Sequence, residues 1–216
     1  MEFDLETLSF ADRYKLLVSV VVPRPIAFVT TLSPQGNVNA APYSFFNVLT
    51  HDPPMVAVGV NARDDGTVKD TSEWTRRSGE FVVNMVSEDI AEKMVEASTD
   101  FPPEVDELAM VGLTAAPSVK VKPPRIAESP VSLECRRHVI LEFGPLRQLL
   151  IGEVLHVAIK DEMMLDVEKR YVDTPALKLV GRMHGRGWYT KTTDMVDIPR
   201  MSVEAFYEKH PEKRPK

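Results

Sequence analysis

The stretch NAAPYSFFN, which runs from Asn39 to Asn47, combines small and polar side chains that suit contact with a flat ring. Its two alanines and its proline allow such a ring to approach the backbone. Ser44 and Asn47 can exchange hydrogen bonds with a polar edge. An isoalloxazine has this combination of an apolar face and a polar rim. The same residue types are also typical of a hairpin strand with one solvent-facing side, so the stretch alone leaves both interpretations open.

A second motif, KDT at residues 69–71, lies where a helix is expected to begin. Free backbone N–H groups and the helix dipole make a helix N-terminus attractive to anions. Lys69 adds a positive charge and Thr71 adds a hydroxyl group, so together they can hold a phosphate. For KDT taken alone, an ordinary helix N-cap is the simpler interpretation.

Other common signatures of chemistry are absent from the sequence. It contains no GxGxxG after a strand, no GxxxxGK[ST], no HExxH and no GxSxG. The five histidines are too scattered to form a metal site, and His138 and His156 lie in apolar runs that predict strands. Cys135 is interpreted as a small buried residue, with a reactive thiol beside Arg136 as the alternative.

Apolar and β-branched runs predict strands around the first motif. Residues 16–32, LLVSVVVPRPIAFVTTL, are interpreted as strand that two prolines interrupt at an edge or a bend. The turn SPQGN at 33–37 contains Gly36, which can adopt a positive φ. A partner strand is therefore expected over residues 38–48.

The remaining sequence predicts more strands than helices. A short helix is expected from Asp70 or Thr71 to Gly79, and an amphipathic helix near residue 90. The proline-rich segment 101–130 is interpreted as a surface excursion of one domain, because VDELAMVGL has apolar residues that can dock on a core. At least six strands with few helices favour a closed antiparallel barrel with peripheral helices. The further strands are expected over residues 55–60, 80–86, 131–144, 149–160 and within 175–192.

Composition and charge argue against several classes of protein. The 216 residues are 44% hydrophobic and carry a net charge of −6, which gives no reason to expect a nucleic-acid partner. No apolar run approaches the roughly 20 residues of a membrane span. The acidic start MEFDLETL lacks the layout of a signal peptide, and a single cysteine precludes an intrachain disulfide. We therefore expect a cytoplasmic protein with no membrane partner.

The order of the motifs resembles the flavin reductase-like family of FMN-binding split-barrel proteins, which includes flavoredoxin-type proteins. The resemblance covers roughly residues 18–189, through PRPIAFVTTLSPQGNVNAAPYSFFNVLTHDPP, KDT, GEFVVN, VDELAMVGLT, PPRIAESPVSLEC and VGRMHGRGWY. It implies a mainly β fold, a six-stranded antiparallel Greek-key split barrel that dimerises and binds FMN near the dimer interface. We expect one domain over residues 1–216, with a core at about 15–190 and a C-terminal extension at 191–216.

The resemblance also implies which residues contact the flavin. Thr30 and Thr31 are expected along the ring or the ribityl chain, residues 41–44 around the ring, and Asn47 at its polar edge. The whole set expected to bind cofactor is Arg24, Thr30, Thr31, Ala41, Pro42, Tyr43, Ser44, Asn47, Lys69, Asp70, Thr71 and His184.

Within this set, Lys69 and Thr71 are expected to contact the phosphate and Asp70 mainly to cap the helix. Arg24 is interpreted either as a flavin contact or as a surface or interface arginine. His184, between glycines, contacts the flavin or a nicotinamide phosphate, or else lies in solvent. No side chain is expected to be catalytic, because the cofactors themselves carry hydride transfer.

One stretch departs from the family pattern. Similar sequences often continue after KDT with an Asn-Ile pair, whereas this chain continues with SEWTRRSG. Trp74 is expected to pack against the protein, although it could also cover the site of a partner subunit. Arg76 and Arg77 are expected at a solvated helix end, with assistance to a phosphate as the alternative.

These expectations lead to three hypotheses of function. The first is an FMN-binding oxidoreductase that uses NAD(P)H to reduce its flavin or a second one, with FAD or riboflavin as other possible flavins. The second is a flavin-containing electron carrier that another redox protein reduces. The third is a non-catalytic module that binds flavin or haem. The expected partners are a second copy of the chain and a monooxygenase or other redox protein.

Overall fold

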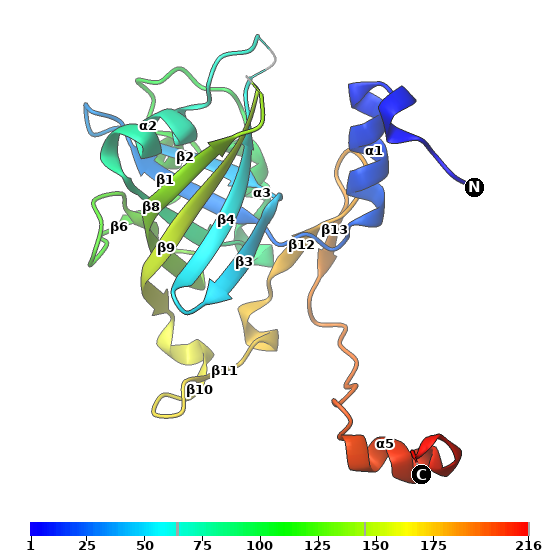
Figure 1. The fold of residues 1–216 in the computed structure, drawn as a ribbon. Coiled ribbons are helices and arrows are strands. Elements are labelled where there is room, and N and C mark those ends of the chain that lie inside the picture. Colours follow the sequence, from blue (N-terminus) through cyan, green and yellow to red (C-terminus); the bar gives the residue numbers. More distant parts are fainter. Residues whose placement is uncertain (64, 145, 216) are drawn as a thin grey trace.

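The computed structural model describes residues 1–63, 65–144 and 146–215. These residues form a seven-stranded antiparallel sheet, with the strand order β2-β1-β5-β8-β9-β4-β3. Figure 1 shows the long strands of this sheet coiling past one another, with helices at its periphery. The strands of the sheet are β1 (Ala27–Leu32), β2 (Val38–Tyr43), β3 (Phe46–His51), β4 (Pro54–Asn61), β5 (Glu80–Met85), β8 (Val131–Glu142) and β9 (Arg147–Ile159).

The remaining elements are short. Three two-stranded ribbons pair β6 with β7, β10 with β11, and β12 with β13. The strands of these ribbons are β6 (Ala115–Ala116), β7 (Arg125–Ile126), β10 (Met164–Asp166), β11 (Tyr171–Val172), β12 (Val180–Arg182) and β13 (Tyr189–Lys191). The α-helices are α1 (Phe10–Val20), α2 (Asp70–Ser78), α3 (Ala91–Glu96), α4 (Glu107–Met110) and α5 (Val203–Lys209). Single turns of 3₁₀-helix span Leu5–Thr7, Glu88–Ile90, Asp161–Met163, Pro175–Leu177 and Pro211–Lys213.

The sheet curls around a core to which each of its seven strands contributes. Val29, Tyr43, Phe81 and Leu150, for example, are buried in this one cluster. Side chains of alternating residues in a strand point to opposite faces, so the intervening residues face outward. The mainly β class with peripheral helices is confirmed. The main sheet has seven strands where six were predicted, because the stretch expected as one strand breaks after Tyr43 into β2 and β3.

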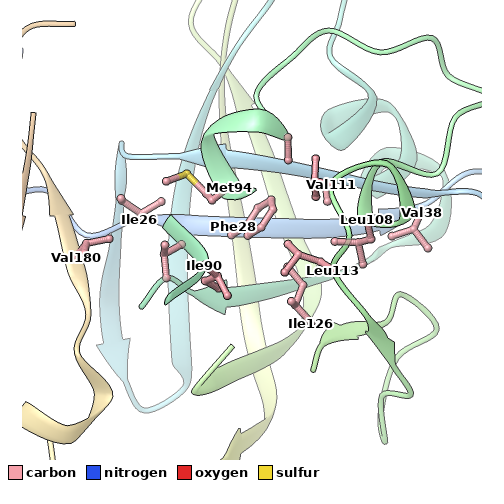
Figure 2. Close-up of a cluster of buried hydrophobic side chains, with 13 residues drawn as sticks. Ile26, Phe28, Val38, Ile90, Met94, Leu108, Val111, Leu113, Ile126 and Val180 are labelled. Atoms are coloured by element: carbon pink, nitrogen blue, oxygen red, sulfur yellow. The ribbon is translucent and has the colours of Figure 1, made fainter. Parts of the chain in front are cut away.

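A second core covers the outer face of β1 and β2. Figure 2 shows Phe28 on β1 meeting Met94 of α3 and Leu108 of α4. Leu113 and Ile126, which follow in the proline-rich segment, are buried in the same cluster. The segment 101–130 therefore packs back onto the sheet, as the apolar residues of VDELAMVGL predicted.

The prediction of strand for residues 16–20 is wrong, because they form the second half of α1. Ser9 caps the start of this helix by accepting a hydrogen bond from the backbone N–H of Asp12 at 3.2 Å. The β-branched run favoured a strand, but the N-cap and the contacts at the C-terminal end of the helix override that weak local preference. The two glycine predictions are confirmed: Gly36 in the first hairpin has φ +91° and Gly79 ends α2 with φ +76°.

Candidate functional site

The two sequence motifs meet in space, at the end of the barrel where α2 begins. The hydroxyl of Tyr43 on β2 donates to the Thr71 hydroxyl oxygen at 2.9 Å, and the Asn39 amide donates to the same oxygen at 3.0 Å. The Asn39 amide also donates to Thr31 on β1 at 3.2 Å. Polar side chains from two strands and a helix are therefore joined into one buried network.

A small cavity opens beside this network. Its volume of about 90 Å³ has room for a phosphate-sized group but not for a whole nucleotide. Its walls come from β2, from Arg63, from residues 69–71 at the start of α2, and from the segment between α3 and α4. The lining residues are Asn39, Ala41, Pro42, Tyr43, Arg63, Lys69, Asp70, Thr71, Ala97, Ser98, Thr99, Asp100, Phe101 and Glu107.

A second cleft of about 200 Å³ continues from the first, with Pro42, Tyr43 and Lys69 common to both. Its other walls are mainly aromatic and small. Tyr14 of α1 and Phe45 lie with their ring centroids 6.5 Å apart, and both are exposed to the cleft side of the molecule. The two hollows together are elongated, with charged groups at one end and aromatic rings at the other. The second cleft is lined by Tyr14, Pro42, Tyr43, Ser44, Phe45, Gly59, Asn61 and Lys69.

The corner between β2 and β3 shapes the second cleft. At this corner the backbone crosses β4, and the Phe45 carbonyl accepts a hydrogen bond from the Gly59 N–H at 2.7 Å. A Cβ atom at Gly59 would lie 2.9 Å from the Cβ of Phe45, closer than two carbon atoms can approach without movement. Glycine at 59 is thus what allows Ser44 and Phe45 to lie against β4 and to form the cleft wall.

The start of α2 offers donors to an anion. Lys69 is the N-cap but makes no side-chain capping bond. Among the described residues, the backbone N–H groups of Asp70 and Thr71 have no recorded partner. Such N–H groups at the positive end of a helix dipole favour a negative ligand.

The charged side chains around the cavity are paired with one another. Arg63 donates to Asp70 at 2.8 Å, and Lys69 donates to Asp100 at 2.9 Å. Arg63 also lies 3.8 Å from the same Asp100 oxygen. Asp70, expected mainly to cap the helix, is instead its first residue and the ion-pair partner of Arg63.

Glu107 is the most deeply buried carboxyl group of the cavity, with 7% of its surface exposed. It accepts a hydrogen bond from the backbone N–H of Ala40 and so covers the free edge of β2. Burial raises the pKa of Glu107 to about 7, opposed by the hydrogen bond from Ala40. Burial likewise raises the pKa of Tyr43, which therefore stays a neutral phenol at physiological pH.

The expected cofactor residues divide into three groups by position. Those brought together around the two hollows are Ala41, Pro42, Tyr43, Ser44, Lys69, Asp70 and Thr71. Thr31 and Thr30 are both fully buried but face opposite sides of the sheet. Thr31 joins the Asn39 network, whereas the Thr30 hydroxyl donates to the Pro124 carbonyl.

The other expected residues lie outside the two hollows. Arg24 is buried and donates to the carbonyls of Val18, Val21 and Met183, so it fastens α1 to the β12–β13 hairpin. Asn47 is exposed on β3, and His184 is exposed at the tip of the β12–β13 hairpin. Neither is among the residues that line the two hollows.

The structure also assigns several residues that the sequence left open. Arg76 pairs with Glu142 and Arg77 with Glu73, so the expected solvated helix end is confirmed. Cys135 is buried in the barrel, as interpreted, and burial raises the pKa of its thiol. Within residues 1–63, 65–144 and 146–215 there is no cluster of three potential metal ligands and no helix long and apolar enough to cross a membrane.

Three charged residues of the cavity were missed in the sequence: Arg63, Asp100 and Glu107. Arg63 precedes the KDT motif by six positions in a charged loop that shows no periodicity. Asp100 directly precedes the proline-rich segment and Glu107 lies within it, so only folding brings the two to α2. Glu107 alone carried a usable signal, since a carboxyl group inside the apolar stretch VDELAMVGL needs a partner when that stretch docks.

Comparison with known proteins places these features in a family. The family model described as "Flavin reductase like domain" matches residues 19–175. The structure superposes on 2-nitrobenzoate 2-nitroreductase NbaA of Pseudomonas fluorescens with a TM-score of 0.86 and 34% identity, covering 94% of this chain and 98% of that one. It superposes on nitrilotriacetate monooxygenase component B of Bacillus cereus with a TM-score of 0.84 and 30% identity, covering 92% of this chain and 98% of that one. A putative flavin reductase with split barrel domain from Shewanella frigidimarina superposes with a TM-score of 0.77 at 20% identity, over 93% of this chain and 100% of that one, which shows the shared fold.

Proposed function

Because this chain belongs to the flavin reductase-like domain family, we propose that it is an oxidoreductase that binds FMN across its two joined hollows. The observation that carries the proposal is the meeting of the NAAPYS and KDT motifs, with an aromatic cleft directly beside a helix start whose N–H groups suit an anion. FMN has the matching layout, a flat ring at one end and a phosphate at the other.

The residues present fit this cofactor. Tyr14, Phe45 and Pro42 offer apolar surface to the ring, and Ser44 offers a hydroxyl to its polar rim. At the other end, Lys69 and the free N–H groups of the first turn of α2 suit the phosphate. The buried network of Asn39, Tyr43 and Thr71 holds the two ends in fixed relation.

When bound, the flavin supplies the redox chemistry, accepting a hydride and passing its electrons on. The residues of the second cleft orient the ring, and the start of α2 holds the phosphate at the other end of the site. Tyr43, as a neutral phenol, donates a hydrogen bond within the network without adding charge. No side chain needs to transfer a proton for hydride transfer, so no catalytic residue is assigned.

We propose NADH or NADPH as the electron donor and a second protein component as one destination of the electrons. The similarity to nitrilotriacetate monooxygenase component B and to the nitroreductase NbaA supports a reductase over a purely structural flavin module. The expected homodimer and the cytoplasmic location are part of the same proposal.

The proposal is tested first by spectroscopy of the purified protein. We expect a flavin absorbance band, or a higher melting temperature when FMN is added. FMN at 100 times its dissociation constant adds about 2.7 kcal/mol of stability, which raises Tm by several degrees. A colourless protein whose Tm does not respond to FMN, FAD or riboflavin contradicts the proposal.

An anaerobic titration then separates a reductase from an electron carrier. NADH or NADPH is expected to bleach the flavin band in stopped-flow measurements. Bleaching by neither nicotinamide, with bleaching by a reduced redox protein, favours the carrier. Tight flavin binding with no reduction by any donor favours the non-catalytic module.

A further inference from the structure

The carboxylate of Asp100 lies where a phosphate oxygen needs to lie if FMN binds as proposed. One oxygen of this carboxylate is 2.9 Å from the Lys69 ammonium and 3.8 Å from the Arg63 guanidinium. These are the two cations among the described residues that line the cavity. Both cations therefore face a carboxylate, and a phosphate has to compete with it for them.

The cavity as built holds no surplus of positive charge. Asp70 pairs with Arg63 at 2.8 Å, and Asp100 pairs with Lys69, so the two cations are matched by two anions. Glu107 adds a third carboxyl group at the base of the cavity. A dianionic phosphate is attracted strongly only after one of these anions has withdrawn from the cations.

Asp100 is the anion that is free to withdraw. Its side chain is 61% exposed, against 12% for Asp70, and its carboxylate has no other recorded partner in the part of the chain that the structure describes. It lies in the segment between α3 and α4, away from regular hydrogen-bonded structure. Asp70, by contrast, is fixed as the first residue of α2, and Glu107 is bound to the edge of β2.

From this geometry, and resting on the proposed FMN site, we propose that Asp100 is a built-in competitor for the flavin phosphate and sets the affinity and lifetime of bound FMN. The phosphate displaces the Asp100 carboxylate from Lys69 and Arg63, and the carboxylate returns when FMN leaves. Flavins without a phosphate do not have to displace it.

The consequence concerns how the flavin is used. An internal anion that re-forms its ion pairs promotes release of FMN, because it offsets part of the phosphate attraction. Weakened retention suits a flavin that leaves after reduction to serve a second protein, and it opposes permanent retention as a prosthetic group. Asp100 is thus a specificity-determining residue that acts on the phosphate and not on the ring.

The test compares FMN and riboflavin binding in the intact protein and in Asp100→Asn, by quenching of flavin fluorescence. The amide keeps the shape of the side chain but removes its charge. Because the pair is exposed and screened, we expect FMN to bind about fivefold tighter and to dissociate correspondingly more slowly. Riboflavin affinity is expected to stay within about twofold.

Glu104→Gln is the matched control, since Glu104 is an exposed carboxylate in the same segment with no recorded ion pair. It is expected to leave both affinities unchanged. As a second measurement, inorganic phosphate alone is expected to raise the melting temperature of Asp100→Asn more than that of the unaltered protein.

The outcomes distinguish this inference from the proposed function. If Asp100→Asn binds FMN no tighter, or shifts riboflavin by the same factor, the competition is refuted while the FMN site stands. If Asp100→Asn binds FMN and riboflavin equally, the phosphate end is not recognised even without the competing carboxylate, and the inference also fails. If it binds no flavin, the proposed function itself fails and the inference falls with it.

Discussion

At the scale of single residues, Glu107 makes the stability of the protein depend on pH. Its pKa is raised from 4.5 to about 7 in the folded protein, chiefly by burial. The folded state therefore binds more protons than the unfolded state between these two values. Since stability falls with pH wherever the folded state holds the extra proton, unfolding free energy is expected to decline from about pH 4.5 to about pH 7.

The variant Glu107→Gln is expected to remove this decline, because its neutral amide still offers an oxygen to the Ala40 N–H. Urea denaturation at pH 5 and pH 8 measures the effect. The difference in unfolding free energy between the two pH values is expected to shrink by about 3 kcal/mol relative to the unaltered protein. An unchanged difference would show that Glu107 is ionised at low cost in the folded state.

Lys69 is the residue whose charge we expect to separate FMN from riboflavin. Lys69→Met removes the charge but keeps an apolar stem along the wall that the two hollows share. FMN is expected to bind about tenfold more weakly, since a charged hydrogen bond is worth roughly 1.5–3 kcal/mol at most sites. Riboflavin binding is expected to stay nearly unchanged.

Fluorescence titration with both flavins checks the Lys69 prediction, with Lys169→Met in the distant β10–β11 turn as the control. Equal weakening of both flavins would mean that Lys69 supports the cleft wall and not the phosphate. Lys69→Met is expected to lower the affinity for FMN, whereas Asp100→Asn is expected to raise it. The two variants therefore test the two partners of the same ion pair.

At the scale of secondary-structure elements, the crossing of β4 and the β2–β3 corner controls the ring end of the site. Gly59→Ala introduces a Cβ that meets the Cβ of Phe45 at 2.9 Å, so the corner must move. Overpacking of this kind costs about 1–3 kcal/mol of stability. Because Ser44 and Phe45 move with the corner, FMN and riboflavin affinity are expected to fall by the same factor.

Thermal unfolding and flavin titration check the Gly59 prediction. Gly187→Ala serves as the control, because a Cβ there has nothing within 4 Å. Loss of FMN affinity alone, with riboflavin unaffected, would contradict a role at the ring end.

The elements themselves were largely predictable, whereas their junctions were not. Alternation of apolar residues predicted the strands, and Gly36 and Gly79 predicted where a turn and a helix end. The alternation of β1 already implied that Thr30 and Thr31 face opposite sides, although the family resemblance assigned both to the flavin. The β-branched residues at 16–20 predict a strand, but the more distant N-cap at Ser9 starts a helix that continues through them.

The two motifs of the candidate site were predictable, but the charged residues around its cavity were not. Each motif was visible as a local pattern, and the resemblance supplied their pairing. The charges that balance the cavity come from segments far apart in the sequence, with Asp100 lying 31 residues after Lys69. Local propensity carries no information about such an ion pair, so only the packing of α3 and α4 on the sheet reveals it.

At the scale of the whole molecule, the C-terminal segment stands away from the barrel. Figure 1 shows this segment, with α5, extending beyond the main body, whereas Val180 of the β12–β13 hairpin is buried in the second core. In residues 193–215, every recorded hydrogen bond, ion pair and aromatic contact is local to that segment. The segment exposes apolar side chains, Val196 and Ile198 among them, and we expect the proposed homodimer to cover them. A second copy of the chain is the partner that the proposed homodimer supplies.

The double variant Val196→Asp with Ile198→Asp tests whether the C-terminal segment takes part in that homodimer. Both side chains are more than 80% exposed within a single chain, so aspartate is expected to leave the fold of that chain intact. Burying two charges in an interface is costly, so light scattering after size-exclusion chromatography is expected to show a dimer for the unaltered protein and dissociation for the variant. Val167→Asp, in the turn between β10 and β11, places a charge at a similarly exposed position and is expected to leave the dimer intact. A variant that keeps the dimer mass and melting temperature would place the interface elsewhere, on α1 or the β12–β13 hairpin.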